Sequence, residues 1–354
     1  MIKTILICLT LFLSVGVFAE KSISEMNPNF RDLMNQGLKP INTYPNEYRE
    51  LPKPLSLFFF ADVHADKTEL ERYCAFIEEN KAYFDDAVCA GDQVLGSPTD
   101  DWDFWGQVKG AEKILFVMGN HDIWYQKRPS EDKKQLNEQE AYDKYYAPYV
   151  KNWNCVCEEG KAYFYKDYTD KKVRLIGINC MSEEAERKKE VEWFRGVLED
   201  ARVKGFSVVA MTHIPPVIFP VSIECNWCEF DRDEGNATYA TDYLKAVKEF
   251  KKKGGDFVVW LAGHTHSDYL LVSKEFPDQL IMVVGETHRG GGAVYSQLTR
   301  TDGTQSQDLA NALIIDTSSK TLKALRLGSH YDRYFRPINA LSINYSTLKI
   351  ITQW

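Results

Sequence analysis

The chain has 354 residues, of which 44% are hydrophobic and 27% charged, a composition typical of a packed globular protein. Its formal net charge of −8, from 43 basic and 51 acidic side chains, argues against an extended basic surface for nucleic acid. The same charge is compatible with a small anionic ligand that metal ions hold locally.

The first nineteen residues have the pattern of a secretory signal peptide. Lys3 supplies a basic start, an apolar run follows over 5–17, and Val17 and Ala19 stand at the cleavage positions. A transmembrane anchor is the alternative, but the run is shorter than the ~20 residues that a span requires. We expect cleavage before Glu20 and export to the periplasm or the cell exterior, with no membrane span left in the mature chain.

Seven cysteines remain after cleavage, an odd number that leaves at least one thiol unpaired. Cys74 and Cys89 lie in apolar contexts and are expected in the core. Cys225 and Cys228 have the spacing of a metal or redox pair. A structural zinc site requires a second such pair, so a loop disulfide in an oxidising compartment is the favoured interpretation.

Strands and helices are expected to alternate along the chain. Residues 20–54 are polar, contain five prolines, and are expected to form a loose N-terminal arm. Short apolar runs predict strands over 55–61, 87–90, 114–118, 173–178, 206–211 and 257–262. Helical spacing of apolar residues predicts helices over 67–81, 183–204 and 239–252. This order is the pattern of a βαβ-based α/β fold.

The remaining segments are less regular. Residues 123–160 are charged and aromatic, which indicates helices and loops. After Leu280 the chain alternates as strands do, including 312–315 and 322–327, and antiparallel hairpins are expected there. No linker divides the chain, so we expect a single domain over 55–330, with 331–354 as a C-terminal extension packed on it.

Most of the predicted strands run directly into a turn that carries Asp, Asn or His. These turns contain Asp62 and His64, Gly91 and Asp92, Asn120 with His121 and Asp122, His213, and finally His264 and His266. Open α/β sheets place their sites in loops at the carboxyl ends of strands. Five of the seven histidines lie in these turns, so the turns are the candidate site.

The residue types in these turns favour a metal site. In 62–64 and 264–266, positions i and i+2 would point to one side of an extended segment, so two ligands can converge. Imidazole and carboxylate without cysteine favour Mn, Fe, Zn or Ni. The candidate ligands are Asp62, His64, Asp92, Asn120, His213, His264 and His266. Seven are too many for one ion with an open position and suit two ions bridged by one carboxylate.

The charge of such a centre would favour an anion. Two divalent ions, the two aspartates and a bridging hydroxide would leave a net charge of about +1. Each turn by itself is common in loops. The interpretation depends on all five occurring together and in order, each behind a strand.

The series of turns resembles the complete signature of the calcineurin-like metallophosphoesterases, over about residues 55–330. The resemblance implies a catalytic domain built as a two-sheet β-sandwich flanked by helices, with a dinuclear metal centre at the strand ends. One ion would be held by Asp62, His64, Asp92 and His266. The other would be held by Asp92, Asn120, His213 and His264, with Asp92 as the bridge.

The resemblance also assigns two catalytic residues. His121 would lie beside the leaving oxygen of the substrate and Asp122 would orient His121. One position departs from the family pattern: the second motif often continues to an Asp or Asn, whereas Gln93, Val94 and Leu95 follow Asp92 here.

The leading hypothesis is an exported phosphoesterase that hydrolyses a phosphomonoester or phosphodiester by attack of a metal-bridging hydroxide. Its cofactors would be two ions of the Mn, Fe or Zn class, divalent or mixed-valence. The alternative from another class is a binding or scaffold protein that kept the fold and the metals, and the seven intact ligands argue against it. A metallohydrolase for a non-phosphate ester is the third hypothesis.

The residues that would contact the substrate are less defined. His288 and Arg289 precede three glycines, and Arg289 could present its forked donors to a phosphate; a surface turn is the alternative. The loop 214–237 and the segment 97–106, with Trp102, Phe104 and Trp105, are candidates for the rim of the site. Surface packing is the favoured interpretation of these aromatic residues.

Overall fold

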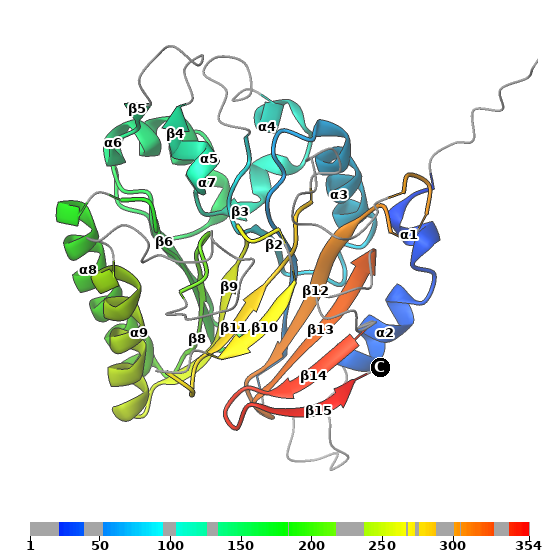
Figure 1. Ribbon diagram of the computed structural model, residues 1–354. Coiled ribbons are helices and arrows are strands. Elements are labelled where there is room, and N and C mark those ends of the chain that lie inside the picture. The colour runs from blue at the N-terminus through cyan, green and yellow to red at the C-terminus, as the bar shows by residue number, and fades with distance from the viewer. Residues whose placement is uncertain are drawn as a thin grey trace, which may run out of the picture.

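Two β-sheets pack face to face, and helices cover their outer faces (Figure 1). The computed structural model describes residues 21–38, 52–94, 104–125, 134–182, 184–216, 237–266, 268–272, 276–287, 301–304, 306–328 and 340–353. The first sheet has seven strands in the order β15-β14-β13-β12-β1-β2-β3, and the second has six in the order β10-β11-β9-β8-β7-β6. This architecture confirms the expected two-sheet α/β fold.

The strands of the first sheet are β1 (Leu55–Phe60), β2 (Asp86–Cys89), β3 (Leu115–Phe116), β12 (Leu309–Asp316), β13 (Thr321–Gly328), β14 (Ala340–Asn344) and β15 (Lys349–Gln353). Those of the second are β6 (Phe164–Tyr168), β7 (Val173–Gly177), β8 (Ser207–Met211), β9 (Asp256–Ala262), β10 (Tyr269–Val272) and β11 (Leu280–Val283). A separate hairpin pairs β4 (Trp124–Tyr125) with β5 (Lys134–Gln135).

The helices are α1 (Ile23–Met26), α2 (Phe30–Leu38), α3 (Lys67–Glu79), α4 (Phe104–Gln107), α5 (Asn120–Ile123), α6 (Glu138–Ala141), α7 (Val150–Trp153), α8 (Glu184–Lys204) and α9 (Ala237–Lys252). Among the described residues, each helix is too short or too polar to cross a bilayer. The three long helices, α3, α8 and α9, lie where the helical spacing predicts them.

Parallel pairing determines where the site forms. In the first sheet β1, β2 and β3 run parallel, and in the second β7, β8, β9 and β11 run parallel. The carboxyl ends of parallel strands lie at one edge of a sheet. The turns that follow β1, β2, β3, β8 and β9 therefore meet at one edge of the sandwich.

Burial on both faces explains why these strands are continuous apolar runs. All six residues of β1 are buried, as expected for a strand covered on both sides. Phe58 and Phe60 pack against Tyr73 of α3, each with ring centroids 5.2 Å apart. On the second sheet, Trp260 of β9 packs against Phe194 of α8. The helices thus complete a core that the sheets alone would leave exposed.

The N-terminal region differs from the expected loose arm. Residues 23–26 and 30–38 form helices, and a capping box between Ser22 and Glu25 starts the first of them. Phe30 is buried and lies 5.0 Å from the ring of Phe76 on α3. The mostly polar composition of this segment did not indicate a packed helix. A few buried apolar residues on one helical face are nevertheless sufficient to attach the segment to the rest of the domain.

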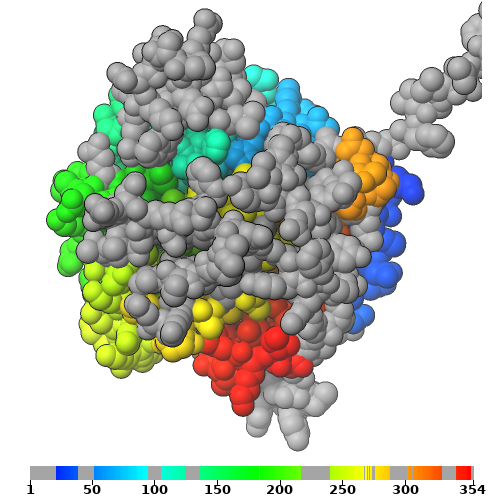
Figure 2. All heavy atoms as spheres, in the orientation of Figure 1, coloured from blue at the N-terminus to red at the C-terminus, as the bar shows by residue number. Residues whose placement is uncertain are grey.

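The last part of the chain completes the first sheet. Strands β12 to β15 pair antiparallel in sequence, as expected for hairpins, and β12 pairs antiparallel with β1. Residues 340–353 form the last two strands, visible at the lower edge of the face in Figure 2. Strand β11, which also follows residue 280, does not belong to these hairpins and pairs parallel with β9. Strand β6 was not predicted, because its residues are mostly polar and half-buried.

Candidate metal centre

The structure brings the predicted ligand turns together in two groups of side chains. Asp62, His64, Asp92 and His266 form the first group, and Asp92, His213 and His264 form the second. Within each group the potential ligand atoms all lie within 4.8 Å of one another. Asp92 belongs to both groups, which is the arrangement that a bridging carboxylate requires.

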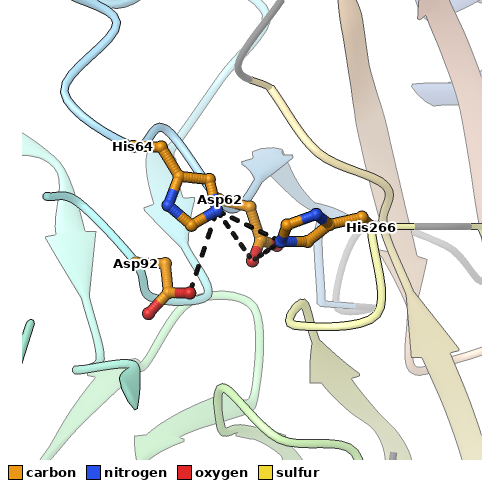
Figure 3. A group of neighbouring side chains, drawn as sticks. All are labelled: Asp62, His64, Asp92 and His266. Carbon is orange, nitrogen blue, oxygen red and sulfur yellow. Dashed lines mark hydrogen bonds and ion pairs between the residues drawn. The ribbon is translucent and has the colours of Figure 1, made fainter. Parts of the chain in front are cut away.

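The first group points inward to one position, as Figure 3 shows. The Nε2 atoms of His64 and His266 are 3.1 Å apart, and Asp62 Oδ1 lies 3.5 Å from His266 Nε2. Asp92 Oδ2 lies 3.9 Å from His64 Nε2. Ligand bonds of about 2.1 Å place neighbouring donors of one ion roughly 3–3.5 Å apart. The spacing and the nitrogen and oxygen donors both fit a single transition-metal ion.

The second group is centred on His213. Its Nε2 lies 3.2 Å from Asp92 Oδ2, 3.2 Å from His264 Nδ1 and 3.1 Å from the Asn120 side-chain oxygen. The other ring nitrogen of His213 lies 2.7 Å from the carbonyl oxygen of Ala90. A proton on that nitrogen, donated to the carbonyl, leaves Nε2 free to bind an ion. All seven candidate ligands are therefore brought to one place.

The backbone reaches this arrangement in a different way from the one expected. Instead of an extended i, i+2 pair, five ligand residues adopt left-handed backbone conformations, with φ angles between 48° and 68°: Asp62, His64, Asp92, His264 and His266. Such a conformation costs a non-glycine residue about 1 kcal/mol or more. Backbone hydrogen bonds between the turns offset it, including Asp62 N–H to Gly91 O and His64 N–H to Asp92 O.

Two glycines in the turns are required by close approach. A Cβ atom at Gly119 would lie 2.0 Å from Asp92 Oδ1, and one at Gly263 would lie 2.6 Å from Asp62 Oδ2. The ligand carboxylates occupy the space that a side chain would need. The glycine before Asn120 and the glycine before His264 therefore belong to the geometry of the site.

The sequence profile of the calcineurin-like phosphoesterases matches residues 55–268 of the chain. The chain belongs to this family. Among curated protein sequences, no significant match was found.

Solved structures share the fold of this calcineurin-like phosphoesterase. A dimetal phosphatase from Danio rerio is 10% identical with a TM-score of 0.51, and the match covers 82% of this chain and 99% of that one. A purple acid phosphatase from yellow lupin seeds is 12% identical with a TM-score of 0.53, covering 84% of this chain and 55% of that one. The family implies a dinuclear metal site, and the donor set described above fits two ions.

Asp122 makes contacts that the sequence analysis did not predict. Its buried carboxylate accepts hydrogen bonds from four backbone N–H groups, those of Asp92, Gln93, Val94 and Gly119, at 2.7–3.1 Å. It thereby ties the turn after β2 to the turn after β3. The carboxylate therefore holds two ligand turns together. The orientation of His121 by Asp122 stays a prediction.

We expect Asp122→Asn to destabilise the fold as well as the site. An amide side chain has one acceptor oxygen and no charge, so two of the four N–H groups would face an NH₂ group. Hydrogen bonds to charged groups contribute about 1.5–3 kcal/mol each, so the free energy of unfolding should fall by about 3 kcal/mol or more. Urea unfolding of the metal-free protein measures this.

Asp170→Asn is the matched control, because Asp170 lies exposed in the turn between β6 and β7. Activity of Asp122→Asn should fall equally for all leaving groups. A variant with unchanged stability that lost activity only with poor leaving groups would instead support the predicted role of Asp122 in orienting His121.

His121 lies at the edge of the first group. Its ring packs edge-on against that of His64 with centroids 4.8 Å apart, and its backbone N–H donates to Asp92 Oδ1 at 2.9 Å. The side chain is half-buried, so it is open on one side. The residue is thus fixed by its backbone next to the metal position, and its side chain is only partly covered.

Glu286 is a site residue that the sequence analysis missed. It is buried in the turn after β11, and its Oε2 lies 3.2 Å from Nδ1 of His266. Its only sequence signal is an acidic residue shortly after an apolar strand. The predicted net charge of about +1 for the centre with two ions bound did not include this carboxylate. With Glu286 ionised, that net charge falls to about zero. An anion would then be attracted by the ions themselves rather than by a net positive site.

Burial lowers the pKa of the imidazoles in the site, whereas neighbouring carboxylates raise it. Burial lowers the pKa of His64 to about 4. Burial also opposes the charged form of His213, but the Asp92 carboxylate raises its pKa to about 10. For His266, the carboxylate of Glu286 likewise outweighs burial and raises the pKa to about 9. His213 and His266 must lose their protons when metal binds.

Some of the other residues that the sequence analysis singled out lie in the described part of the chain, and the rest lie outside it. Trp105 is buried against Phe116 and donates to the Ala111 carbonyl, so it belongs to the core rather than to a rim. Cys74 and Cys89 are buried, as expected, and form no disulfide. The remaining candidates lie outside the described residues: Trp102, Cys225, Cys228, His288 and Arg289.

Proposed function

We propose that this member of a metal-dependent phosphoesterase family is an active hydrolase of a small phosphoester. The observation that carries the proposal is the convergence of six candidate ligands in two groups that share Asp92, with the side-chain oxygen of Asn120 beside the second group. Two bound ions would supply a nucleophilic water and neutralise the charge that develops on a phosphoryl group. A scaffold would not require a complete and bridged donor set.

The side chains of the chain have separate tasks in this reaction. Asp62, His64 and His266 would hold one ion, and Asn120, His213 and His264 the other, with Asp92 contacting both. His121 would donate a proton to the leaving oxygen, because it lies beside the first position and is open on one side. Asp122 would keep the two turns at a fixed separation.

A substrate panel tests the proposal. Mature protein is freed of metal with a chelator and reloaded with Mn²⁺, Fe²⁺ or Zn²⁺. It is then assayed on alkyl and nitrophenyl phosphate monoesters and diesters, and on carboxylic esters. We expect hydrolysis that requires metal and stops on renewed chelation. Binding of two metal equivalents with no turnover of any phosphoester would favour the scaffold. Turnover of carboxylic esters alone would favour the third hypothesis.

We further infer that the protein is exported, on the pattern of residues 1–19. Protein recovered from outside the cytoplasm should begin at Glu20, and its Cys225 and Cys228 should be oxidised to a disulfide. Intact-mass analysis and thiol labelling measure both. A retained Met1 would contradict export, and a labelled Cys228 would contradict the loop disulfide.

A further inference from the structure

The two ligand groups hold their histidines in different ways. In the second group, His213 is fully buried and its Nδ1 lies against a backbone carbonyl, that of Ala90. In the first group, the His266 side chain is 29% exposed and its Nδ1 lies 3.2 Å from the Glu286 carboxylate. The partner of His213 is part of the β-sheet framework, whereas the partner of His266 is a side chain that a single substitution removes.

The backbone on both sides of Glu286 is fixed. Gly285 N–H donates to Asp268 Oδ1 at 3.1 Å, and Asp268 forms an ion pair with Arg326 of β13 at 2.6 Å. Thr287 N–H donates to the carbonyl of Ala61, the residue before Asp62. Glu286 is therefore held at a defined place relative to the turn that carries the first ligands.

This arrangement defines the tautomer of His266. When the ring loses one proton to bind metal, the remaining proton on Nδ1 faces the buried Glu286 carboxylate and Nε2 becomes the ligand atom. Nε2 lies 3.1 Å from His64 Nε2 and 3.5 Å from Asp62 Oδ1. A carboxylate behind a metal-binding imidazole fixes the ring and makes it a stronger ligand. His266 needs this support because its ring is the most exposed in the first group and its backbone is left-handed.

We propose that Glu286 is a positioning residue that sets the affinity of the first metal position through His266. The proposal rests on the metal centre of the proposed function and deepens it. It makes the two positions unequal: loss of Glu286 weakens the first and leaves the second intact. The side chain contacts neither substrate nor ion in this role.

The test is a metal titration that does not depend on turnover. Metal-free wild type, Glu286→Gln and Glu286→Ala are titrated with Zn²⁺ against a chromophoric chelator. Wild type should bind two equivalents. In Glu286→Gln we expect one equivalent to weaken by 10- to 100-fold and the other to change by less than about threefold. Glu286→Ala should weaken the same equivalent at least as much, because it also removes the hydrogen-bond acceptor.

A spectroscopic measurement and two controls accompany the titration. In protein loaded with Co²⁺, Glu286→Gln should lose the absorption of one ion selectively. Glu78→Gln, on the exposed face of α3 beside Lys81, should match wild type. Asp268→Asn weakens the loop without removing Glu286, so it should lower the thermal midpoint of the metal-free protein more than Glu286→Gln does.

The outcomes separate this proposal from the one on which it rests. Wild type that binds fewer than two equivalents overturns both. If wild type binds two equivalents, the result for Glu286→Gln decides the role of Glu286 alone. Affinities equal to those of wild type, or the same loss of affinity for both equivalents, would overturn that role. Loss of one equivalent in both glutamate variants supports it.

Discussion

Asp92→Asn is expected to abolish phosphoester hydrolysis and to do so more completely than His64→Ala. Asp92 Oδ2 lies 3.2 Å from His213 and 3.9 Å from His64, and Oδ1 accepts the N–H of His121. The carboxylate therefore contacts both metal positions and the turn of the proposed general acid. His64 serves one position only.

The size of the effect follows from the charge that is lost. An ion at each position contributes several kcal/mol to stabilisation of the transition state, so loss of the pair should reduce kcat/KM on the order of 10³-fold or more. Chelation of wild type should have the same effect. The measurements are kcat/KM and elemental analysis of bound metal, with Asp170→Asn as the charge-matched control. Near-normal activity of Asp92→Asn with two metals still bound would remove the dinuclear centre from the mechanism.

His121→Ala is expected to slow the hydrolysis of alkyl phosphoesters by roughly 10²-fold or more, the low end of the contribution of a general acid. A basic alkoxide cannot depart without a proton, whereas a nitrophenolate can, so nitrophenyl esters should be affected much less. Imidazole suits the task because its unperturbed pKa is about 6.5. Its ring packs against that of His64, at the edge of the first metal position, where the proposed reaction would place the leaving group.

A plot of log kcat/KM against the pKa of the leaving group tests this assignment. The line for His121→Ala should be steeper than that for wild type, with the two approaching each other for good leaving groups. Metal content must be equal in the two proteins, because the backbone of His121 touches Asp92. Parallel lines would mean that His121 only positions the substrate, and the role of general acid would be withdrawn.

Much of the fold and the metal site could be predicted because the informative signals are local. A strand buried on both faces is a continuous apolar run, as in β1, and a ligand turn follows it directly in the sequence. Parallel pairing then brings such turns to one edge regardless of loop length. That is why the positions of Asp62, Asp92, His213 and His264 could be expected without coordinates.

The remaining features depend on contacts between segments distant in sequence. The left-handed φ angles at Asp62 and His64 are stabilised by hydrogen bonds to another turn, and nothing in the local residues indicates them. Three of the four backbone N–H groups that bind Asp122 belong to a different turn, and Glu286 contacts His266 across two loops. The N-terminal helices were missed for a different reason, because few apolar residues can attach a mostly polar helix.

The hydrogen bonds between turns have a consequence for the order in which the molecule forms. His264 N–H donates to both carboxylate oxygens of Asp62, which lies 202 positions earlier in the chain, in a turn that follows a strand of the other sheet. Contacts of such long range form late, since both sheets must fold before the two turns can meet. An ion bound between them stabilises only the assembled protein, by about 2.7 kcal/mol at a concentration one hundred times its Kd. Metal binding is therefore expected only after the two sheets have packed against each other, and it can be used to follow that step.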